Sequence, residues 1–191
     1  MERKIILAST SPRRIELLTK AGVEFEAVAS DYEEDMTLPM EPKELAKFLS
    51  KGKAEAVAKN YPDAIIIGGD TFIAFDGKIL GKPHTPERAR DMLKMLSGQT
   101  HSVISGFTVI DTKNGKVISD AEEALITFQK LSEEEIDDYI RTGEPLKRAG
   151  AYAIQTIEKT FIEKWEGDYD AIVGLPTSRV LEALKELGVS F

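Results

Sequence analysis

The chain contains no cysteine and only two histidines. Without cysteine it can form no disulfide bond, no thiolate zinc site and no cysteine nucleophile. Neither His84 nor His101 stands in a spacing typical of metal ligands, so we assign them no role. The chemistry of an active site is therefore left to carboxylates, hydroxyls, amides and basic side chains. A cysteine-free chain also fits a reducing compartment, and we expect a cytoplasmic protein.

Long apolar runs and a basic excess are also missing. No stretch approaches the ~20 apolar residues that a membrane-spanning helix needs, and the apolar run near the amino terminus is too short for a signal peptide. The formal net charge is −8 and the pI about 5.0. Because sequence-independent binding to nucleic acid requires a broad basic surface, we expect neither nucleic acid nor a membrane as partner. A small polyanion in a locally basic pocket remains compatible with these numbers.

The chain has 191 residues, of which 42% are hydrophobic, enough for a complete core. Repeats, low-complexity tracts and a clear linker are absent, so we predict one α/β domain over residues 1–191, with two lobes around a cleft. Apolar patterns predict strands over 4–8, 23–29, 64–67, 72–75, 78–80, 101–111, 116–128, 150–155, 160–165 and 171–173. Helix signals begin at Pro12, Pro42, Pro86 and Ser132, and a last helix carries Val180 to Leu187.

The stretch over residues 64–83 places a single carboxylate between two strand signals. The apolar run over 64–67 is stopped by Gly68 and Gly69, Asp70 follows, and a hairpin returns Lys82 toward it. An acid where a buried strand ends is well placed to bind a metal or activate water. Asp in a turn also commonly accepts bonds from backbone N–H groups. This stretch alone leaves the two interpretations evenly balanced.

Residues 9–14, STSPRR, form a hydroxyl-rich turn that leads into a helix. Ser11 suits the N-cap and Pro12 the first helical position. Arg13 and Arg14 then stand in the first turn, where the helix dipole repels cations. An anion at that end removes the conflict, because N–H groups, hydroxyls and guanidinium groups all bind phosphate. We favour a phosphate site over the alternative that both arginines are solvated or paired with an acid such as Glu16.

Two further charged features have two interpretations each. The acidic run over 31–35, which contains Glu33 and Glu34, is either a solvated loop or a source of ligands for Mg²⁺ or Mn²⁺. Lys53 lies near the buried stripe of its helix. Its ammonium either reaches solvent along apolar surface or points into a cleft.

Six motifs together give the chain a family resemblance. They are STSPRR over 9–14, GDT over 69–71, LGKP over 80–83, LSG over 96–98, AGAYAIQ over 149–155 and VGLP over 173–176. In this order they resemble the Maf family of nucleoside triphosphate pyrophosphatases. The resemblance spans nearly the whole chain, and the combination is specific although each motif alone is weak.

The resemblance implies an elongated, mixed α/β fold similar to that of inosine triphosphate pyrophosphatases. It implies hydrolysis of a nucleoside triphosphate to the monophosphate and pyrophosphate, with a divalent cation, Mg²⁺ or Mn²⁺. Asp70 matches the catalytic acid and, with Glu33 or Glu34, the metal ligands. Arg13, Thr71 and Gln155 match the positions that mark the branch preferring dTTP and UTP. The expected substrate-binding residues are Ser9, Ser11, Arg13, Arg14, Lys53, Thr71, Lys82 and Gln155.

The departures from the family pattern are small. Gly69 replaces an alanine, and Thr156 replaces a glycine in a loop beside the expected base pocket. Two other functions stay open at this point: a pyrophosphatase for purine or modified nucleotides such as 7-methyl-GTP, and a nucleotide-binding regulator of cell division. A homodimer is also compatible with the sequence.

Overall fold

The computed structural model describes residues 3–189. Within this range seven strands form one mixed sheet in the order β2-β1-β3-β5-β6-β7, and β4 pairs with β3 outside this order. The strands are β1 (Lys4–Leu7), β2 (Glu26–Ala27), β3 (Ala64–Phe75), β4 (Lys78–Leu80), β5 (Thr100–Asp111), β6 (Lys116–Phe128) and β7 (Ile162–Glu166). The helices are α1 (Pro12–Lys20), α2 (Pro42–Ala58), α3 (Pro86–Leu96), α4 (Glu133–Arg141), α5 (Ile154–Ile157), α6 (Tyr169–Val173) and α7 (Thr177–Glu186), with single 3₁₀ turns η1 (Pro145–Lys147) and η2 (Ala149–Ala151).

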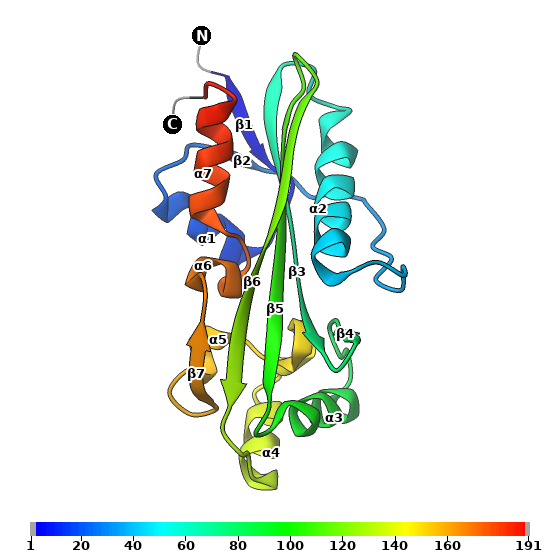
Figure 1. Ribbon diagram of the computed structural model, residues 1–191, viewed down its shortest axis with the longest axis vertical. Helices are drawn as coiled ribbons and strands as arrows, with labels where there is room; N and C mark the ends of the chain where they lie inside the picture. Colours follow the sequence, from blue (N-terminus) through cyan, green and yellow to red (C-terminus); the bar gives the residue numbers. More distant parts are fainter. Residues whose placement is uncertain (1–2, 190–191) are drawn as a thin grey trace.

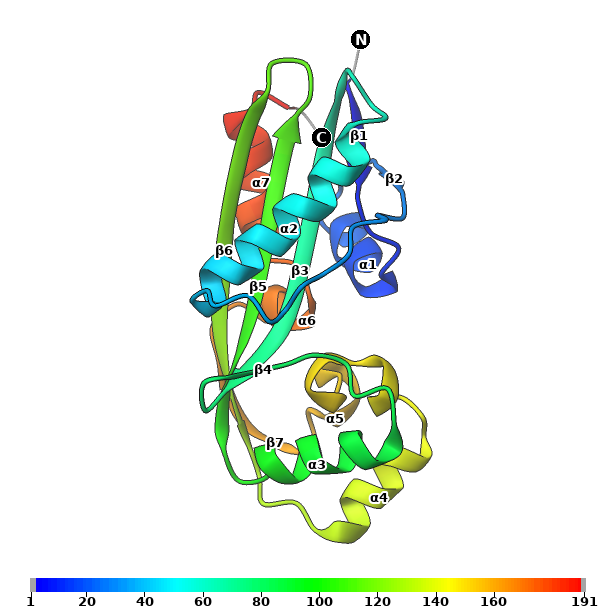
Figure 2. The ribbon, with the colours of Figure 1, turned by 90° about the vertical axis from the view of Figure 1, so that its right-hand side faces the viewer.

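Three long strands connect the two halves of the molecule. Figure 1 shows β3, β5 and β6 running along the long axis of the molecule. Helices α1, α2 and α7 lie around their upper part, and α3, α4 and α5 gather at their lower end (Figure 2). We call these the upper and lower lobes. The predicted elongated, mixed α/β fold with two lobes is therefore confirmed. The helices of the described residues include none that is both long and apolar enough to span a membrane.

Strand β3 changes partners where the lobes meet. On one edge it pairs in parallel with β1, up to the Leu7–Ile67 pair, and then antiparallel with β4 from Ile73 onward. Between these pairings, no strand in the described range covers that edge of β3. On its other edge β3 pairs with β5 throughout. The prediction that the strand ends before Asp70 is therefore wrong. The backbone hydrogen bonds to β5 continue before and after Asp70. The two glycines therefore do not end the strand.

Helix α2 lies unusually close to the sheet because two glycines face it. A Cβ atom on Gly68 would stand 2.3 Å from the carbonyl oxygen of Ser50, and one on Gly106 would stand 2.3 Å from that of Ala46. No side chain larger than hydrogen fits at either position without moving the helix backbone. This close packing brings Lys53 of α2 down to the sheet beside Asp70, as described below.

Two short apolar segments are not the strands we predicted. The segment 150–155 contains the 3₁₀ turn η2, with Gly150 in the left-handed region at φ 66°, and then the start of α5. The segment 171–173 belongs to helix α6, because Asp168 caps its first turn by accepting a bond from the Asp170 N–H. Runs of so few residues fit a strand and a buried helical turn equally well. The two hairpins, α3 and the Ser132–Glu135 capping box are confirmed.

We predict that Gly106→Ala lowers the free energy of unfolding by about 1–3 kcal/mol, because the added methyl group meets the backbone of α2 rather than a flexible side chain. Urea denaturation measures the change. Gly81→Ala is the matched control, since its Cβ would meet only the flexible end of the Met36 side chain, with the thioether sulfur at 3.3 Å. Equal unfolding midpoints for the two variants would contradict the packing described here.

We also predict a pH dependence of stability that originates at His101. This side chain is 2% exposed and packs edge-on against Phe128 and Tyr152. Burial lowers the pKa of His101 to about 4. The unfolded histidine titrates near 6.5, so below that pH the unfolded chain binds the extra proton first. The stabilisation is therefore complete above about pH 6.5 and is lost progressively toward pH 4.

Between pH 6.5 and 5 the expected loss is about 2 kcal/mol in the free energy of unfolding. Chemical denaturation at these two pH values measures it. In His101→Gln the free energy of unfolding should be nearly the same at the two pH values, whatever the absolute stability. His84→Gln, at an exposed position, is the control and should keep it. An unchanged pH dependence in His101→Gln would show that other groups cause it.

Candidate active site

A polar cavity of about 280 Å³ lies beside the carboxyl end of β1. Its wall is built by the turn that leads into α1, by the segment 29–34, by α2 and by the residues after β4. The α1 N-terminus therefore contributes to a cavity that also receives positive side chains, which is an arrangement suited to an anion. The cavity brings together six of the predicted site residues: Ser9, Ser11, Arg14, Glu34, Lys53 and Lys82.

A buried carboxylate lies behind this cavity and is linked to it through Lys53. The Lys53 Nζ atom is 2.5 Å from Asp70 Oδ1 and 2.7 Å from Glu34 Oε1. Asp70 is 3% exposed and Lys53 9% exposed, so the pair is removed from bulk water. The second Asp70 oxygen, Oδ2, is buried and has no hydrogen-bond partner among the described residues. Asp70 therefore keeps one free acceptor inside the site.

Arg14 crosses the open edge of β3 and joins three elements. Its Nε donates to the Gly174 carbonyl at 2.9 Å, and its terminal nitrogens donate to the hydroxyls of Ser9 at 3.3 Å and Thr71 at 3.4 Å. Gly69 leaves room for it, because a Cβ there would lie 3.2 Å from Arg14 Nε. Burial lowers the pKa of Arg14, while the charges of Asp70 and Glu34 raise it. The guanidinium is thus a built-in cation in the wall of this cavity.

Thr71 lies on the opposite face of β3 from Asp70, as consecutive residues of a strand must. Its hydroxyl bonds to the Ser105 hydroxyl at 2.7 Å and to the Gly174 carbonyl at 3.1 Å. Gly174 ends α6 with φ 146°, a conformation that directs its carbonyl toward Arg14 and Thr71 and that other residues rarely adopt. Thr71 therefore helps to hold the two faces of the site together.

A second, smaller cavity of about 30 Å³ lies on the Thr71 side of the sheet. Arg13 and Thr71 line it together with apolar residues, among them Tyr152, Ile154 and Val173. The Arg13 Nε atom is buried without a partner among the described residues. Burial first, then the nearby charges of Arg148 and Arg14, lower the pKa of Arg13 to about 10. Arg13 is thus still a cation at neutral pH, with an unused donor beside an apolar cavity.

The structure adds detail on the surroundings of four predicted site residues. Gln155 is exposed on α5 and does not line either cavity. Glu33 and Glu34 are both exposed, and Glu34 forms an ion pair with Lys53. Ser11 stands at the N-cap of α1 but its side chain makes no capping bond there.

The donor set fits a hard divalent cation only in part. The described residues contain no group of three histidine or acidic side chains that could enclose a metal ion. Asp70 and Glu34 do supply two carboxylates on one ammonium, and Asp70 Oδ2 is an orphaned buried acceptor. Mg²⁺ is commonly held by one or two carboxylates together with substrate phosphates. These two residues therefore suit a cation that arrives with a phosphorylated ligand.

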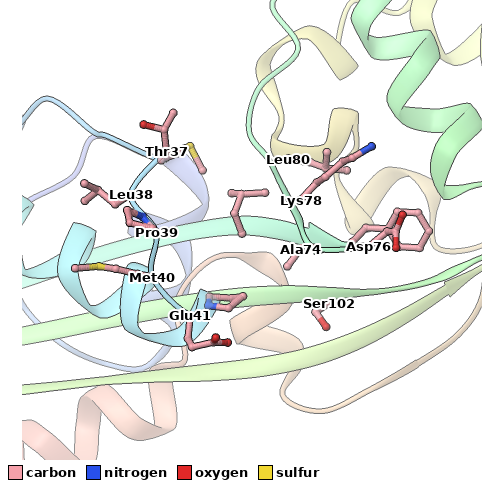
Figure 3. Close-up of a pocket in the computed structure, with 15 residues that line it drawn as sticks. Thr37, Leu38, Pro39, Met40, Glu41, Ala74, Asp76, Lys78, Leu80 and Ser102 are labelled. Atoms are coloured by element: carbon pink, nitrogen blue, oxygen red, sulfur yellow. The ribbon is translucent and has the colours of Figure 1, made fainter.

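A larger cavity of about 840 Å³ lies elsewhere, between the loop before α2 and the β3–β4 hairpin. Figure 3 shows Thr37 to Glu41 on one side of it and Ala74 to Leu80 on the other. None of the predicted site residues lines it. Because buried charge and orphaned polar atoms gather at the two smaller cavities, we place the active site there and not in the larger one.

Three residues near these cavities were not anticipated. Ser105 on β5 bonds to Thr71, and Glu144 and Arg148 lie close enough to Arg13 to change its pKa. Ser105 carries no signal in the sequence, since it is one of several hydroxyl residues in β5 and a hydroxyl residue in a strand has many structural explanations. Arg148 directly precedes the AGAYAIQ motif, and that position could have marked it.

The family model for Maf-like proteins matches residues 4–187 of this chain. A dTTP/UTP pyrophosphatase of Methanosarcina barkeri is 48% identical over 189 residues, covering 98% of this chain and 96% of the relative. A dTTP/UTP pyrophosphatase of Bacillus cereus is 44% identical over 187 residues, covering 98% and 97%. The structure of the Staphylococcus aureus Ham1 protein matches with a TM-score of 0.53 at 12% identity, covering 96% of this chain and 98% of Ham1, a likeness of fold alone. Since both the family model and these relatives span nearly the whole chain, the protein belongs to the family of Maf-like proteins.

Proposed function

We propose that this chain hydrolyses dTTP and UTP to the nucleoside monophosphate and pyrophosphate. The observation that carries the proposal is the buried Asp70 carboxylate, joined through Lys53 to a cavity lined by basic and hydroxyl side chains. The names of the two relatives, dTTP/UTP pyrophosphatase, support the same reaction. A nucleotide-binding regulator would need the cations but would have no use for a buried carboxylate with a free acceptor.

The 280 Å³ cavity is the site proposed for the triphosphate. Lys53, Lys82 and Arg14 offset its negative charge, and the N-terminus of α1 adds backbone N–H donors. Lys53 divides its ammonium between Asp70 and Glu34, so an incoming phosphate competes with these two carboxylates for it. The Ser9 and Ser11 hydroxyls lie in the same wall and can donate to phosphate oxygens.

Asp70 is the proposed general base. Its free Oδ2 atom can accept a proton from the attacking water, and Lys53 and Arg14 then stabilise the charge that develops on the phosphates. We propose Glu34, rather than Glu33, as a protein ligand of a divalent cation. Asp70 is the second candidate ligand, and since Lys53 takes its Oδ1 atom, its Oδ2 atom serves either as ligand or as base. When bound, Mg²⁺ or Mn²⁺ would neutralise phosphate charge and make pyrophosphate a better leaving group. No observation on the described residues favours a purine nucleotide, 7-methyl-GTP or a purely regulatory role over this reaction.

A nucleotide panel tests the proposed substrates. We expect kcat/KM for dTTP and UTP to exceed that for CTP, ATP, GTP and 7-methyl-GTP by at least about tenfold, because a site matched to one base edge leaves buried groups unpaired with another. Pyrophosphate release in the presence of Mg²⁺ or Mn²⁺ measures it. Comparable values for UTP, CTP and ATP, or a preference for 7-methyl-GTP, would contradict the proposal.

Asp70→Asn should lower kcat by at least about 100-fold, because the variant keeps the shape of the side chain and loses the base. Asp76→Asn is the matched control: it removes a carboxylate from the hairpin after the same strand, outside both cavities of the site. Thermal unfolding should be used to check that both variants are folded. A folded Asp70→Asn variant with activity close to that of the control would remove Asp70 from the mechanism.

A further inference from the structure

A second charged cluster lies on the lower lobe, beside the small cavity. It consists of Glu144 and Arg148, whose side chains form an ion pair, and of Arg13 of α1, which lines the cavity. Glu144 and Arg148 flank the 3₁₀ turn η1, and Ala149, the next residue in the chain, lines the cavity. The reaction proposed above uses neither Glu144 nor Arg148, so their arrangement needs its own explanation.

Glu144 is held in place by two hydroxyl groups. Its Oε2 atom accepts bonds from Thr156 Oγ1 at 2.7 Å and from the Tyr139 hydroxyl at 3.2 Å. Burial raises the pKa of Tyr139 to about 12, so its hydroxyl is protonated and can donate. The same hydroxyl accepts a bond from the Ala153 N–H at 3.2 Å, and Ala153 lines the cavity. Thr156 is thus part of the support for Glu144.

The other carboxylate oxygen of Glu144 contacts Arg148. Arg148 Nη2 lies 3.5 Å from Glu144 Oε1. The Arg148 Nε atom is buried and has no partner among the described residues, and the same is true of Arg13 Nε. Leaving a buried donor unpaired costs about 1–3 kcal/mol. Arg13 lines the cavity, and Arg148 directly precedes Ala149, which also lines it. The two unpaired guanidinium donors therefore favour a ligand that brings a hydrogen-bond acceptor.

The cavity itself limits what that acceptor can be. Its volume of about 30 Å³ is close to the share of one water molecule in the liquid, so a single small polar group fits. Its other lining residues are mostly apolar, which suits the edge of a planar ring. Uracil and thymine present carbonyl oxygens at two ring positions, whereas cytosine has an amino donor at one of them. Guanidinium groups only donate hydrogen bonds, so they pair with the carbonyl oxygen and not with the amino group.

This inference rests on the proposed function: we propose that Arg148, held by Glu144 and Thr156, donates a hydrogen bond to the ring carbonyl of bound uracil or thymine that cytosine replaces with an amino group, and so rejects cytosine. Arg148 is then a specificity-determining residue, and Glu144 and Thr156 are positioning residues. This assignment differs from our expectation for Gln155, which is exposed outside both cavities.

Equilibrium binding of UMP and CMP tests the base contact without turnover. We expect the unmutated chain to bind UMP about tenfold more tightly than CMP, which corresponds to one buried hydrogen bond gained and one mismatch avoided. Arg148→Met keeps the apolar stem and removes the donors, so the ratio should fall close to one through weaker UMP binding. Arg141→Met is the matched control, an exposed arginine of α4 paired with Asp138, and it should leave the ratio unchanged.

Thr156→Val tests the support for Glu144 while leaving Arg148 in place. Loss of one of the two hydroxyls that hold Glu144 should lower the UMP-to-CMP ratio by about threefold. If Arg148→Met does not fold, Thr156→Val still tests the proposed base contact. For UTP hydrolysis, Arg148→Met should raise KM and change kcat little, because the base is held equally in the ground and transition states.

Three results would overturn the inference: equal binding of UMP and CMP by the unmutated chain, an unchanged ratio in folded Arg148→Met, or equal weakening of both ligands. The last result would indicate a phosphate contact or a structural role. Pyrophosphate release from UTP by the unmutated chain reports separately on the proposed function. A chain that binds UMP selectively, depends on Arg148 for it and releases no pyrophosphate would support the base contact and contradict the proposed function.

Discussion

The ion pair between Lys53 and Asp70 is the interaction on which the rest of the site depends. Removing two charges from water is costly and is repaid only by close, well-satisfied geometry. Here the Lys53 Nζ atom reaches Asp70 and Glu34 at 2.5 and 2.7 Å, and Arg14 adds a second cation nearby. Two cations and two carboxylates thus offset one another. Lys53 can reach Asp70 only because Gly68 and Gly106 let α2 approach the sheet to backbone contact.

Strand β3 then distributes the chemistry over two faces of one sheet. Asp70 points toward α2, where Lys53 links it to the 280 Å³ cavity, whereas Thr71, the next residue, points toward the small cavity near α6. The free edge of β3 between its pairings with β1 and β4 leaves room for Arg14 to pass from one side to the other. A single extended segment can therefore hold the reacting end and the base end of one nucleotide, provided that its neighbours leave that edge open.

Local signals in the sequence were sufficient for much of the fold. Pro12, Pro86 and the Ser132–Glu135 pair mark helix starts that the structure confirms, and both hairpins form at their Asp-Gly and Asn-Gly turns. These signals are reliable because capping and turn geometry involve only neighbouring residues. The segments 150–155 and 171–173 were assigned wrongly as strands, since a short apolar run fits either element until its packing partners are known.

By itself, the sequence determined the order of most helices and strands, the cluster of hydroxyls and arginines at the start of α1, and a family resemblance carried by six separated motifs. Only the tertiary structure decided that Glu34 and not Glu33 contacts Lys53, that Gln155 is exposed, and that Arg13 lines the small cavity. The physical reason is distance along the chain. Which way a loop side chain points depends on contacts with residues far away in sequence, and those contacts exist only once the two lobes have formed around the shared sheet.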